Sequence, residues 1–240
     1  MKILSWNAQG YDGQVEKFVF ISNLLNTGEY DLICIQEAGH VLGSFDQSVF
    51  GTNYPIVYQQ KENSESRSVN HLQEYYAIYY EWGSKNKRCS LVTYVKKCLY
   101  SESSVYIPPM IRNIRGGLIT TINTVYGLVN VCNIHLQSGD PDFAWQQFQE
   151  ILVNMQGATY PFIIIGDFNI DAIRSQPFIS PQNHFYPIII NNQIIITQKS
   201  GGCLDYAYSE IYPPSEYGIL APPGNLSDHA PVFYIFKMQV

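Results

Sequence analysis

Three apolar runs along the chain each end in a carboxylate or a carboxamide. These runs extend from Ile3 to Asn7, from Leu32 to Glu37, and from Phe162 to Asp167 and Asn169. Short apolar runs without helical spacing predict buried strands. Because a rigid sheet holds the polar side chains at its strand ends in fixed positions, several such ends on one rim would form an oxygen-rich site for a metal ion and a phosphate.

The rest of the pattern predicts many strands and two helices. Apolar side chains recur at helical spacing over 14–26 and over 140–156, and Pro141 stands near the start of the second helix. Further strands are expected over 74–82, 89–95, 103–107, 117–124, 127–135, 161–166 and 230–237, with a hairpin turn at Tyr126-Gly127, and the polar stretch 60–73 is expected to be a surface loop. This order predicts one domain over residues 1–240, built from two β-sheets packed face to face with helices outside.

Composition narrows the class of protein. The 240 residues carry a net charge of −6, which argues against a nucleic-acid packaging role but not against a nuclease, because a divalent cation reverses the local sign of an acidic site. No apolar stretch reaches the roughly 18 residues that a membrane span needs, and we expect no signal peptide. Of the five cysteines, Cys34, Cys89 and Cys132 are expected in the core, and a disulfide stays open.

Further polar residues stand at or near predicted strands and each has two interpretations. His135 ends a strand as a packed histidine or as a catalyst, and Asp205 interrupts an apolar segment as a capping residue or as the carboxylate that orients a histidine. Arg88 and Arg115 are solvated charges or phosphate ligands. The Asp228-His229 pair is a weak motif by itself. It becomes more informative because the polar residues at the ends of the three apolar runs precede it in a defined order.

The ordered set resembles the endonuclease/exonuclease/phosphatase superfamily, which includes DNase I and the abasic-site endonucleases. The matching strings are Ser5-Trp6-Asn7, Gln36-Glu37, Ile134-His135, Gly166-Asp167-Phe168-Asn169, Leu204-Asp205-Tyr206 and Ser227-Asp228-His229. They extend over nearly the whole chain. The resemblance implies an α/β fold of the DNase I type, a four-layer sandwich in which two mostly antiparallel sheets are flanked by helices.

Other strings resemble more closely the catalytic subunit of cytolethal distending toxin. They are Trp6-Asn7-Ala8-Gln9-Gly10, Gln36-Glu37-Ala38-Gly39, Arg115-Gly116-Gly117 and Thr197-Gln198, whereas Leu136–Gly139 departs from that family. This resemblance implies an Mg²⁺-dependent DNA endonuclease, with Mn²⁺ or Ca²⁺ as alternative ions, that damages DNA in target cells. It also implies a secreted toxin that acts in the nucleus, carried by delivery subunits, monomeric in isolation and not inserted stably in a membrane.

The resemblance further implies how an ion and a phosphate would be held. Glu37 would ligate Mg²⁺, with Asn7 and Asp228 in or beside its coordination shell. Arg88 and Arg115 would grip DNA phosphates.

The same resemblance implies the groups that act on the reacting atoms. His229, oriented by Asp205, would be a general base or would polarise the phosphate. Asp167 and Asn169 would position the attacking water, and His135 would hydrogen-bond the phosphate or act as an acid.

Two other functions compete with the nuclease. A phosphatase acting on an inositol phospholipid would use the same metal and histidine site, and guanidinium groups would bind either substrate. The acidic chain disfavours an anionic membrane surface. A catalytically dead binding module of the same fold would have lost site residues, and all the matching positions are intact. An unrelated α/β protein would not carry the clusters in this order.

Overall fold

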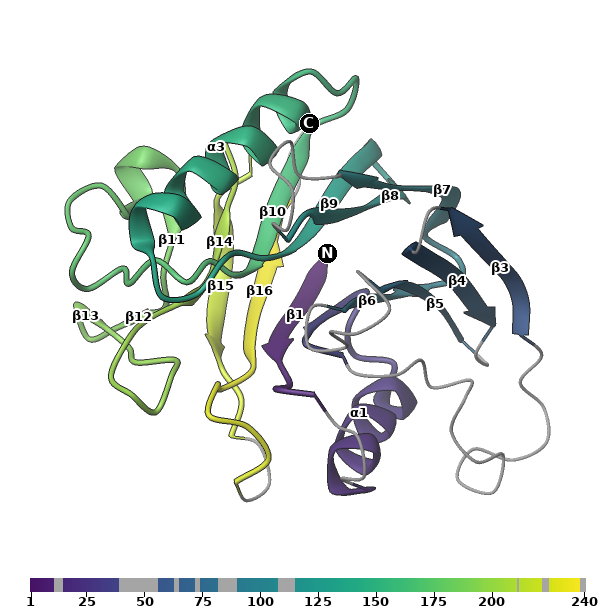
Figure 1. Ribbon diagram of the computed structural model, residues 1–240, viewed down its shortest axis with the longest axis horizontal. Helices are drawn as coiled ribbons and strands as arrows, with labels where there is room; N and C mark the ends of the chain where they lie inside the picture. The colour runs from purple at the N-terminus through teal and green to yellow at the C-terminus, as the bar shows by residue number, and fades with distance from the viewer. Residues whose placement is uncertain are drawn as a thin grey trace.

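Two β-sheets packed face to face form the centre of the molecule, with one long helix on each outer side (Figure 1). The computed structural model describes residues 1–10, 15–38, 56–62, 65–71, 74–81, 90–107, 115–210, 212–221 and 225–237. Most strand pairs are antiparallel, and each sheet contains one parallel pair. The predicted α/β sandwich of the DNase I type is therefore confirmed.

The first sheet is built from both ends of the chain. Its strand order is β15-β16-β1-β2-β6-β5-β4-β3. The strands are β1 (Lys2–Asn7), β2 (Leu32–Gln36), β3 (Ile56–Glu62), β4 (Glu65–His71), β5 (Tyr75–Glu81), β6 (Leu91–Lys96), β15 (Pro214–Ile219) and β16 (Val232–Phe236). Strand β1 pairs in parallel with β2 and antiparallel with β16, so the strand nearest the C-terminus lies beside the first strand.

The second sheet comes from the middle of the chain. Its order is β11-β14-β10-β9-β8-β7, from β7 (Tyr100–Ile107), β8 (Gly117–Thr124), β9 (Gly127–His135), β10 (Phe162–Asp167), β11 (Phe185–Tyr186) and β14 (Asp205–Tyr208). Strands β12 (Ile189–Ile190) and β13 (Gln193–Ile194) form a separate small hairpin, and η3 (Pro181–Asn183) is a short 3-10 helix. Helices α1 (Val15–Thr27) and α3 (Pro141–Gln156) cover the outer faces of the first and second sheets.

Alternation of side chains along the strands explains the layers. In β10, Ile163 and Ile165 point into the core between the sheets, whereas Ile164 lies in the cluster that packs against α3. In β1, Ile3 faces the second sheet and Leu4 faces α1. Both faces of these strands are buried, which is why their sequences are continuous apolar runs without polar alternation.

Most of the predicted elements are found. The helices expected over 14–26 and 140–156 correspond to α1 and α3, and the hairpin at Tyr126-Gly127 joins β8 to β9. Asp140 caps α3 by accepting a hydrogen bond from Phe143 N at 3.1 Å. No helix within the described residues is both long and apolar enough to cross a membrane.

The prediction of a surface loop over 60–73 is wrong. Residues 56–62 and 65–71 form β3 and β4, a hairpin at the edge of the first sheet. Strand β3 is the edge strand, and β4 pairs with both β3 and β5. Backbone hydrogen bonds stabilise strands at this end of a sheet without an apolar pattern, so a polar sequence gives no indication of them. Of the cysteines expected in the core, Cys34 and Cys132 are buried free thiols, and Cys89 lies outside the described residues.

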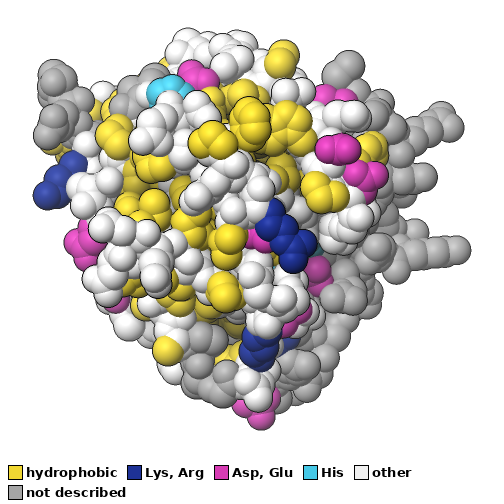
Figure 2. Space-filling model, turned by 90° about the vertical axis from the view of Figure 1, so that its left-hand side faces the viewer, with side chains coloured by type: hydrophobic (Ala, Val, Ile, Leu, Met, Phe, Trp, Pro, Cys, Tyr) yellow, Lys and Arg dark blue, Asp and Glu magenta, His cyan; other side chains and the backbone are white. Residues whose placement is uncertain are grey.

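One side of the molecule is largely uncharged. Figure 2 views the side that carries β11, β12 and β13, and shows hydrophobic side chains spread between small, separate groups of charged ones. The segment 171–200 contributes four exposed large apolar side chains, Ile173, Phe178, Ile190 and Ile196. The described lysine and arginine side chains on this face lie apart and form no continuous basic band for a polyanion.

Gly166 provides a test of how tightly β9 and β10 approach each other. Its φ is +150°, and a Cβ added there would lie 2.0 Å from the backbone oxygen of Ile134 in β9. We therefore expect Gly166→Ala to lower the free energy of unfolding by about 3 kcal/mol or more, measured by urea denaturation. Gly157→Ala is the matched control, because that glycine ends α3 with ordinary contacts and a helical φ of −76°; its unfolding free energy should stay within about 1 kcal/mol. Equal midpoints for both variants would contradict the close approach.

Candidate functional site

Several strand termini meet at one rim of the sandwich. In the second sheet, Asp167 at the end of β10 is in register with His135 at the end of the parallel strand β9. On its other side Asp167 is in register with Asp205, the first residue of the antiparallel strand β14. The topology therefore places three ionisable side chains from three strands next to one another.

The first sheet brings its own polar residues to the same rim. Asn7 ends β1 in register with Gln36, and Glu37 follows with a left-handed backbone, φ 48°. His229 lies just before β16. Its carbonyl oxygen accepts a hydrogen bond from Trp6 Nε1 at 3.0 Å. The first sheet thus supplies an amide, a carboxylate and an imidazole opposite the three groups of the second.

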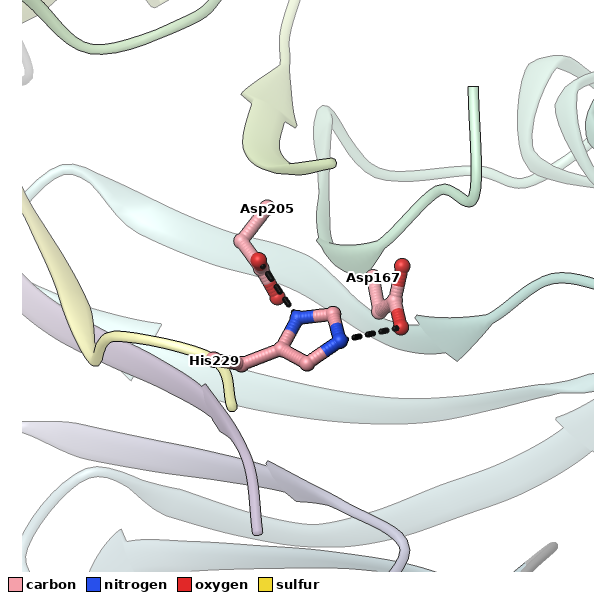
Figure 3. Close-up of side chains that lie close together, drawn as sticks. All are labelled: Asp167, Asp205 and His229. Atoms are coloured by element: carbon pink, nitrogen blue, oxygen red, sulfur yellow. Dashed lines mark hydrogen bonds and ion pairs between the residues drawn. The ribbon is translucent and has the colours of Figure 1, made fainter. Parts of the chain in front are cut away.

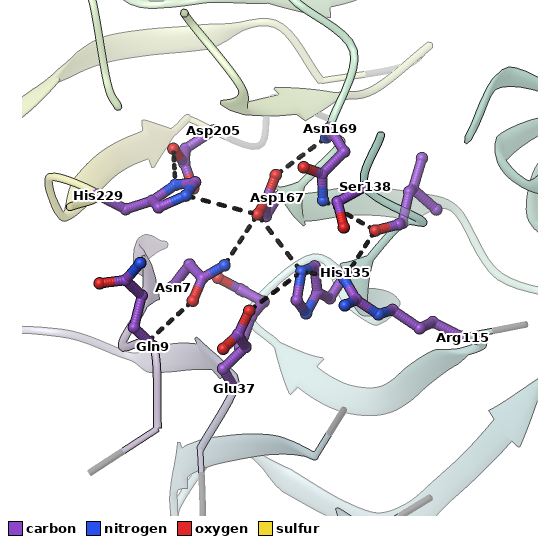
Figure 4. A network of polar contacts seen from close by, with 12 residues as sticks. Asn7, Gln9, Glu37, Arg115, His135, Ser138, Asp167, Asn169, Asp205 and His229 are labelled. Carbon is purple, nitrogen blue, oxygen red and sulfur yellow. Dashed lines mark hydrogen bonds and ion pairs between the residues drawn. The ribbon is translucent and has the colours of Figure 1, made fainter. Parts of the chain in front are cut away.

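Asp167 lies at the centre of the network (Figure 4). Its Oδ2 accepts a hydrogen bond from Asn7 Nδ2 at 2.8 Å, and its Oδ1 accepts one from Asn169 N at 2.9 Å. The Nε2 atoms of His135 and His229 lie 3.5 Å and 3.9 Å from Oδ2. Burial of this side chain, together with the nearby carboxylate of Asp205, raises the pKa of Asp167 to about 6, although His229 and the two hydrogen bonds favour the charged form.

His229 is held between two carboxylates. Its ring lies between Asp205 and Asp167 in Figure 3, and Nδ1 is 2.8 Å from Asp205 Oδ2. Burial alone would lower the pKa of His229, but the bonded carboxylate of Asp205, followed by Asp167 and Asp228, raises it to about 10. In the metal-free protein the imidazolium therefore dominates at neutral pH.

This shift also connects His229 to stability. The folded protein holds its proton more tightly than the unfolded chain, in which histidine has a pKa of about 6.5. The stabilisation from the charged pair is therefore complete below about pH 6.5 and is lost as the pH rises through 10.

His135 is engaged by an arginine. Arg115 Nη1 contacts His135 Nε2 and also donates to the carbonyl oxygen of Leu136 at 3.0 Å. An arginine guanidinium has no acceptor atom, so His135 Nε2 must be the acceptor in this contact. The Oε1 atom of Glu37 lies 3.8 Å from the same nitrogen, so the ring stands between a cation and two carboxylates.

The donor set suits a hard divalent cation. Among the described residues, one group of Asp, Glu, His and Cys side chains has ligand atoms that all lie within 4.8 Å of one another, namely Asp167, Asp205 and His229. In this group Asp205 Oδ2 and His229 Nδ1 are bonded to each other, which favours an orienting pair over two ligands. The buried Oδ1 atoms of Asp205 and Asp228 have no hydrogen-bond partner within the described part of the chain, so carboxylate oxygens remain that fit an oxygen-binding ion.

The predicted site residues are largely brought together. Figure 4 shows a connected group drawn from both sheets: Asn7, Glu37, Arg115, His135, Asp167, Asn169, Asp205 and His229. The carboxylate of Asp228 lies beside it, with Oδ1 3.7 Å from His229 Nε2. Arg88 lies outside the described residues. The roles of these residues stay predictions.

Two hydroxyl side chains that support the site were not among the predicted site residues. Ser227 Oγ donates to Asn7 O at 2.7 Å and accepts from His229 N at 3.1 Å. Thr197 Oγ1 accepts from the backbone nitrogens of Leu204 and Asp205 at 2.9 Å and 3.1 Å. Both residues belong to strings that carry the resemblance, Ser227-Asp228-His229 and Thr197-Gln198, and that membership was the available indication.

The pairing of His229 with Asp205 can be tested by NMR. In the metal-free protein, the imidazole of His229 should remain protonated through pH 8. Asp205→Asn should lower the pKa of His229 by roughly 1–3 units, because the nearest carboxylate is removed while the burial remains. Asp142→Asn, which changes an exposed carboxylate in the first turn of α3, is the control and should leave this titration unchanged. An unaltered titration in Asp205→Asn would refute the pairing.

Solved structures share this fold at low sequence identity. A functionally unknown conserved protein from Enterococcus faecalis V583 aligns with a TM-score of 0.68 at 16% identity, covering 100% of both chains. The APE2 catalytic domain of Xenopus laevis aligns with a TM-score of 0.64 at 16% identity, over 99% of this chain and 92% of that one. A chain of the cytolethal distending toxin from Actinobacillus actinomycetemcomitans gives 0.58 at 19%, over 98% and 97%. At these identities the likeness shows the fold alone.

A family model settles the relationship that the motifs indicated. No curated protein matches the chain. The model described as the Endonuclease/Exonuclease/phosphatase family matches residues 4–229, a span that contains each predicted site residue from Asn7 to His229. The chain belongs to the endonuclease/exonuclease/phosphatase family, whose members hydrolyse phosphate esters.

Proposed function

We propose that this protein is a divalent-metal-dependent endonuclease that hydrolyses phosphodiester bonds of DNA. The observation that carries the proposal is the buried carboxylate of Asp167, held by Asn7 and Asn169 at the rim where both histidines approach it. Hydrolysis needs a group that accepts a proton from water, groups that bind the phosphoryl oxygens and compensation for charge on the leaving oxygen. Each need has a candidate at this rim.

Asp167 is our candidate for the group that accepts the proton. With a pKa of about 6 it is ionised at pH 7–8 and still basic enough to take a proton from a positioned water. Asn169 fixes its orientation through the backbone hydrogen bond, and its own Nδ2 is held by Leu136 O at 2.8 Å. As the water oxygen bonds to phosphorus, its proton passes to Asp167 and the bond from phosphorus to the leaving oxygen breaks.

The histidines and arginines are our candidates for binding the phosphate. His229, kept as an imidazolium by Asp205, has Nε2 directed toward the centre of the site and would donate a hydrogen bond to a phosphoryl oxygen (Figure 3). This assignment favours polarisation of the phosphate over proton abstraction by His229. His135 would donate a hydrogen bond to the phosphate from Nε2, which requires that Arg115 turns from this nitrogen to the phosphate and that the ring carries its proton on Nε2. Arg115 and Arg88 would add the charge of their guanidinium groups.

Glu37, Asn7 and Asp228 are the residues that we propose hold the ion. Oxygen ligands of this kind suit Mg²⁺, and Mn²⁺ would satisfy the same donors. When bound, the ion polarises the phosphate and neutralises charge on the leaving oxygen. Glu37 is 7% exposed and Asn7 is 2% exposed, so both are fixed before any ion or substrate arrives.

The proposal that DNA is the substrate rests on the sequence strings that resemble the toxin subunit. Residues 6–10 and 36–39 carry that likeness, from which we also propose a secreted genotoxin that acts in the target-cell nucleus with delivery subunits. The described side chains on the face seen in Figure 2 form no basic band. We propose that binding of DNA depends on the bound ion and on the arginines near the site.

Plasmid nicking tests the site and the substrate together. With Mg²⁺, the purified protein should convert supercoiled plasmid to the nicked form, and EDTA should stop the reaction. His229→Ala and His135→Ala should each slow nicking by about 10²–10⁴-fold, because the phosphate loses a hydrogen-bonding group. His184→Ala, which changes an exposed histidine at the end of η3, is the matched control and should nick at the wild-type rate.

Other results of this experiment have defined meanings. Phosphate release from phosphoinositide vesicles without nicking would move the function to the phosphatase branch of the family. Full nicking by either site variant would contradict the assigned site. Absence of both activities with Mg²⁺ or Mn²⁺ would leave the binding-module interpretation.

Arg115 can be tested through the salt dependence of DNA binding. Loss of one phosphate contact should reduce the slope of log affinity against log salt by about 0.9. Arg115→Ala should therefore bind DNA more weakly and with a shallower slope, measured by fluorescence anisotropy in Ca²⁺. Lys237→Ala is the control, because that exposed cation follows β16 at the end away from His229. An unchanged slope for Arg115→Ala would remove this residue from the phosphate site.

A further inference from the structure

Gln9 links two segments that lie at opposite ends of the sequence. Its backbone nitrogen donates to Asn7 Oδ1 at 3.0 Å, and its side-chain Oε1 accepts from the backbone nitrogen of Asp228 at 3.0 Å. Figure 4 shows Gln9 beside Asn7, at the edge of the network. Gln9 therefore contacts two of the residues that we propose hold the ion. It is not itself one of the residues that we propose bind the ion, bind the phosphate or accept the proton.

The backbone of Gln9 is held in an uncommon conformation. Its φ is 52°, in the left-handed region that few residues other than glycine adopt. The ammonium of Lys17, 2% exposed on α1, donates to the carbonyl oxygens of Ala8 and Gly10, which flank Gln9, at 2.6 Å each. Gly10 N in turn donates to Glu37 O at 2.7 Å. The segment after β1 is thus fixed from the helix and from β2.

The hydrogen bond to Asn7 selects the orientation of its carboxamide. Because Oδ1 accepts from Gln9 N, the Nδ2 end must face Asp167, where it donates at 2.8 Å. The oxygen keeps a second lone pair for an ion. A reversed carboxamide would present a donor to Gln9 N and an acceptor to a carboxylate, and both contacts would be lost.

The side chain of Gln9 acts on the other segment. Asp228 is half-buried, and its Oδ1 has no hydrogen-bond partner within the described residues. Its backbone is anchored at two points, through Gln9 Oε1 and through its carbonyl oxygen, which accepts from Lys199 N at 2.8 Å. The bond from Gln9 ties the backbone of Asp228 to the segment that carries Asn7, and it acts beside the bond from Ser227 Oγ to Asn7 O.

We propose that Gln9 is a positioning residue that sets the spacing of Asn7 and Asp228 for a divalent cation. This inference rests on the proposed function. Groups that orient ligands from behind change metal affinity by about 10–100-fold when they are removed. The side-chain acceptor of Gln9 should therefore control how tightly the ion binds, more than how fast the loaded enzyme turns over.

The Gln9→Asn variant distinguishes the contribution of the Gln9 side chain from that of its backbone. Asparagine tolerates the left-handed conformation better than glutamine does, so the segment should fold unchanged, but its side chain is one methylene too short to reach Asp228 N. Gln9→Glu keeps an acceptor at the original length. Gln193→Asn, an exposed position in β13, is the matched control.

Binding of Mn²⁺ alone, followed by electron paramagnetic resonance, provides a readout that does not need turnover. We expect Gln9→Asn to weaken Mn²⁺ binding about 10-fold or more, with Gln9→Glu and Gln193→Asn at or above the wild-type affinity. Urea midpoints of the metal-free variants should match that of the wild type. At saturating metal, the turnover number of Gln9→Asn should return to within about twofold of the wild type, which a general structural defect would not allow.

The two proposals fail in different ways. Wild-type protein that binds no Mn²⁺ and hydrolyses no DNA would overturn the proposed function. Wild-type binding and hydrolysis combined with unchanged Mn²⁺ affinity in Gln9→Asn would overturn the positioning role alone. A loss of affinity in Gln9→Glu equal to that in Gln9→Asn would also overturn it, because the acceptor would then be irrelevant.

Discussion

The hydrogen bond from Asn7 to Asp167 is the contact on which the arrangement of the site depends. It joins the end of β1 in one sheet to the end of β10 in the other, inside a rim where Asp167 is 1% exposed. A carboxylate at this depth requires donors, because an unpaired buried charge costs several kcal/mol. The two sheets therefore stack in the register that brings the amide to the carboxylate, and the approach of His229 to Asp167 depends on that register.

Much of the fold could be predicted because its central strands are buried on both faces. The apolar runs that end in Asn7 and Asp167 identified β1 and β10 and their polar termini, and helical spacing identified α1 and α3. The hairpin of β3 and β4 could not be found in this way. It forms the last two strands at one end of the first sheet, where backbone pairing is sufficient and a polar sequence is tolerated.

The site was only partly predictable, because its charges depend on contacts between distant elements. Asp205 was expected to orient a histidine, but the sequence does not reveal that Asp167 and Asp228 also raise the pKa of His229, so that its imidazolium is favoured. The engagement of His135 by Arg115 depends on where β8 begins relative to the end of β9. The substrate is less predictable still, because the same groups bind a phosphodiester of DNA and a phosphate of a lipid headgroup.

The route of the chain through the two sheets determines when this site can exist during synthesis. The strands of the second sheet all come from one continuous segment, β7 to β14, which also contains the small hairpin of β12 and β13. The first sheet receives β15 and β16 only after that segment has been made. On the ribosome, β1 therefore waits for its antiparallel partner, and His229 emerges after all the carboxylates of the second sheet. A nascent chain that stops before His229 lacks both the imidazole and the strand that pairs antiparallel with β1, so the last strand of the first sheet and the last side chain of the site are made within a few residues of each other.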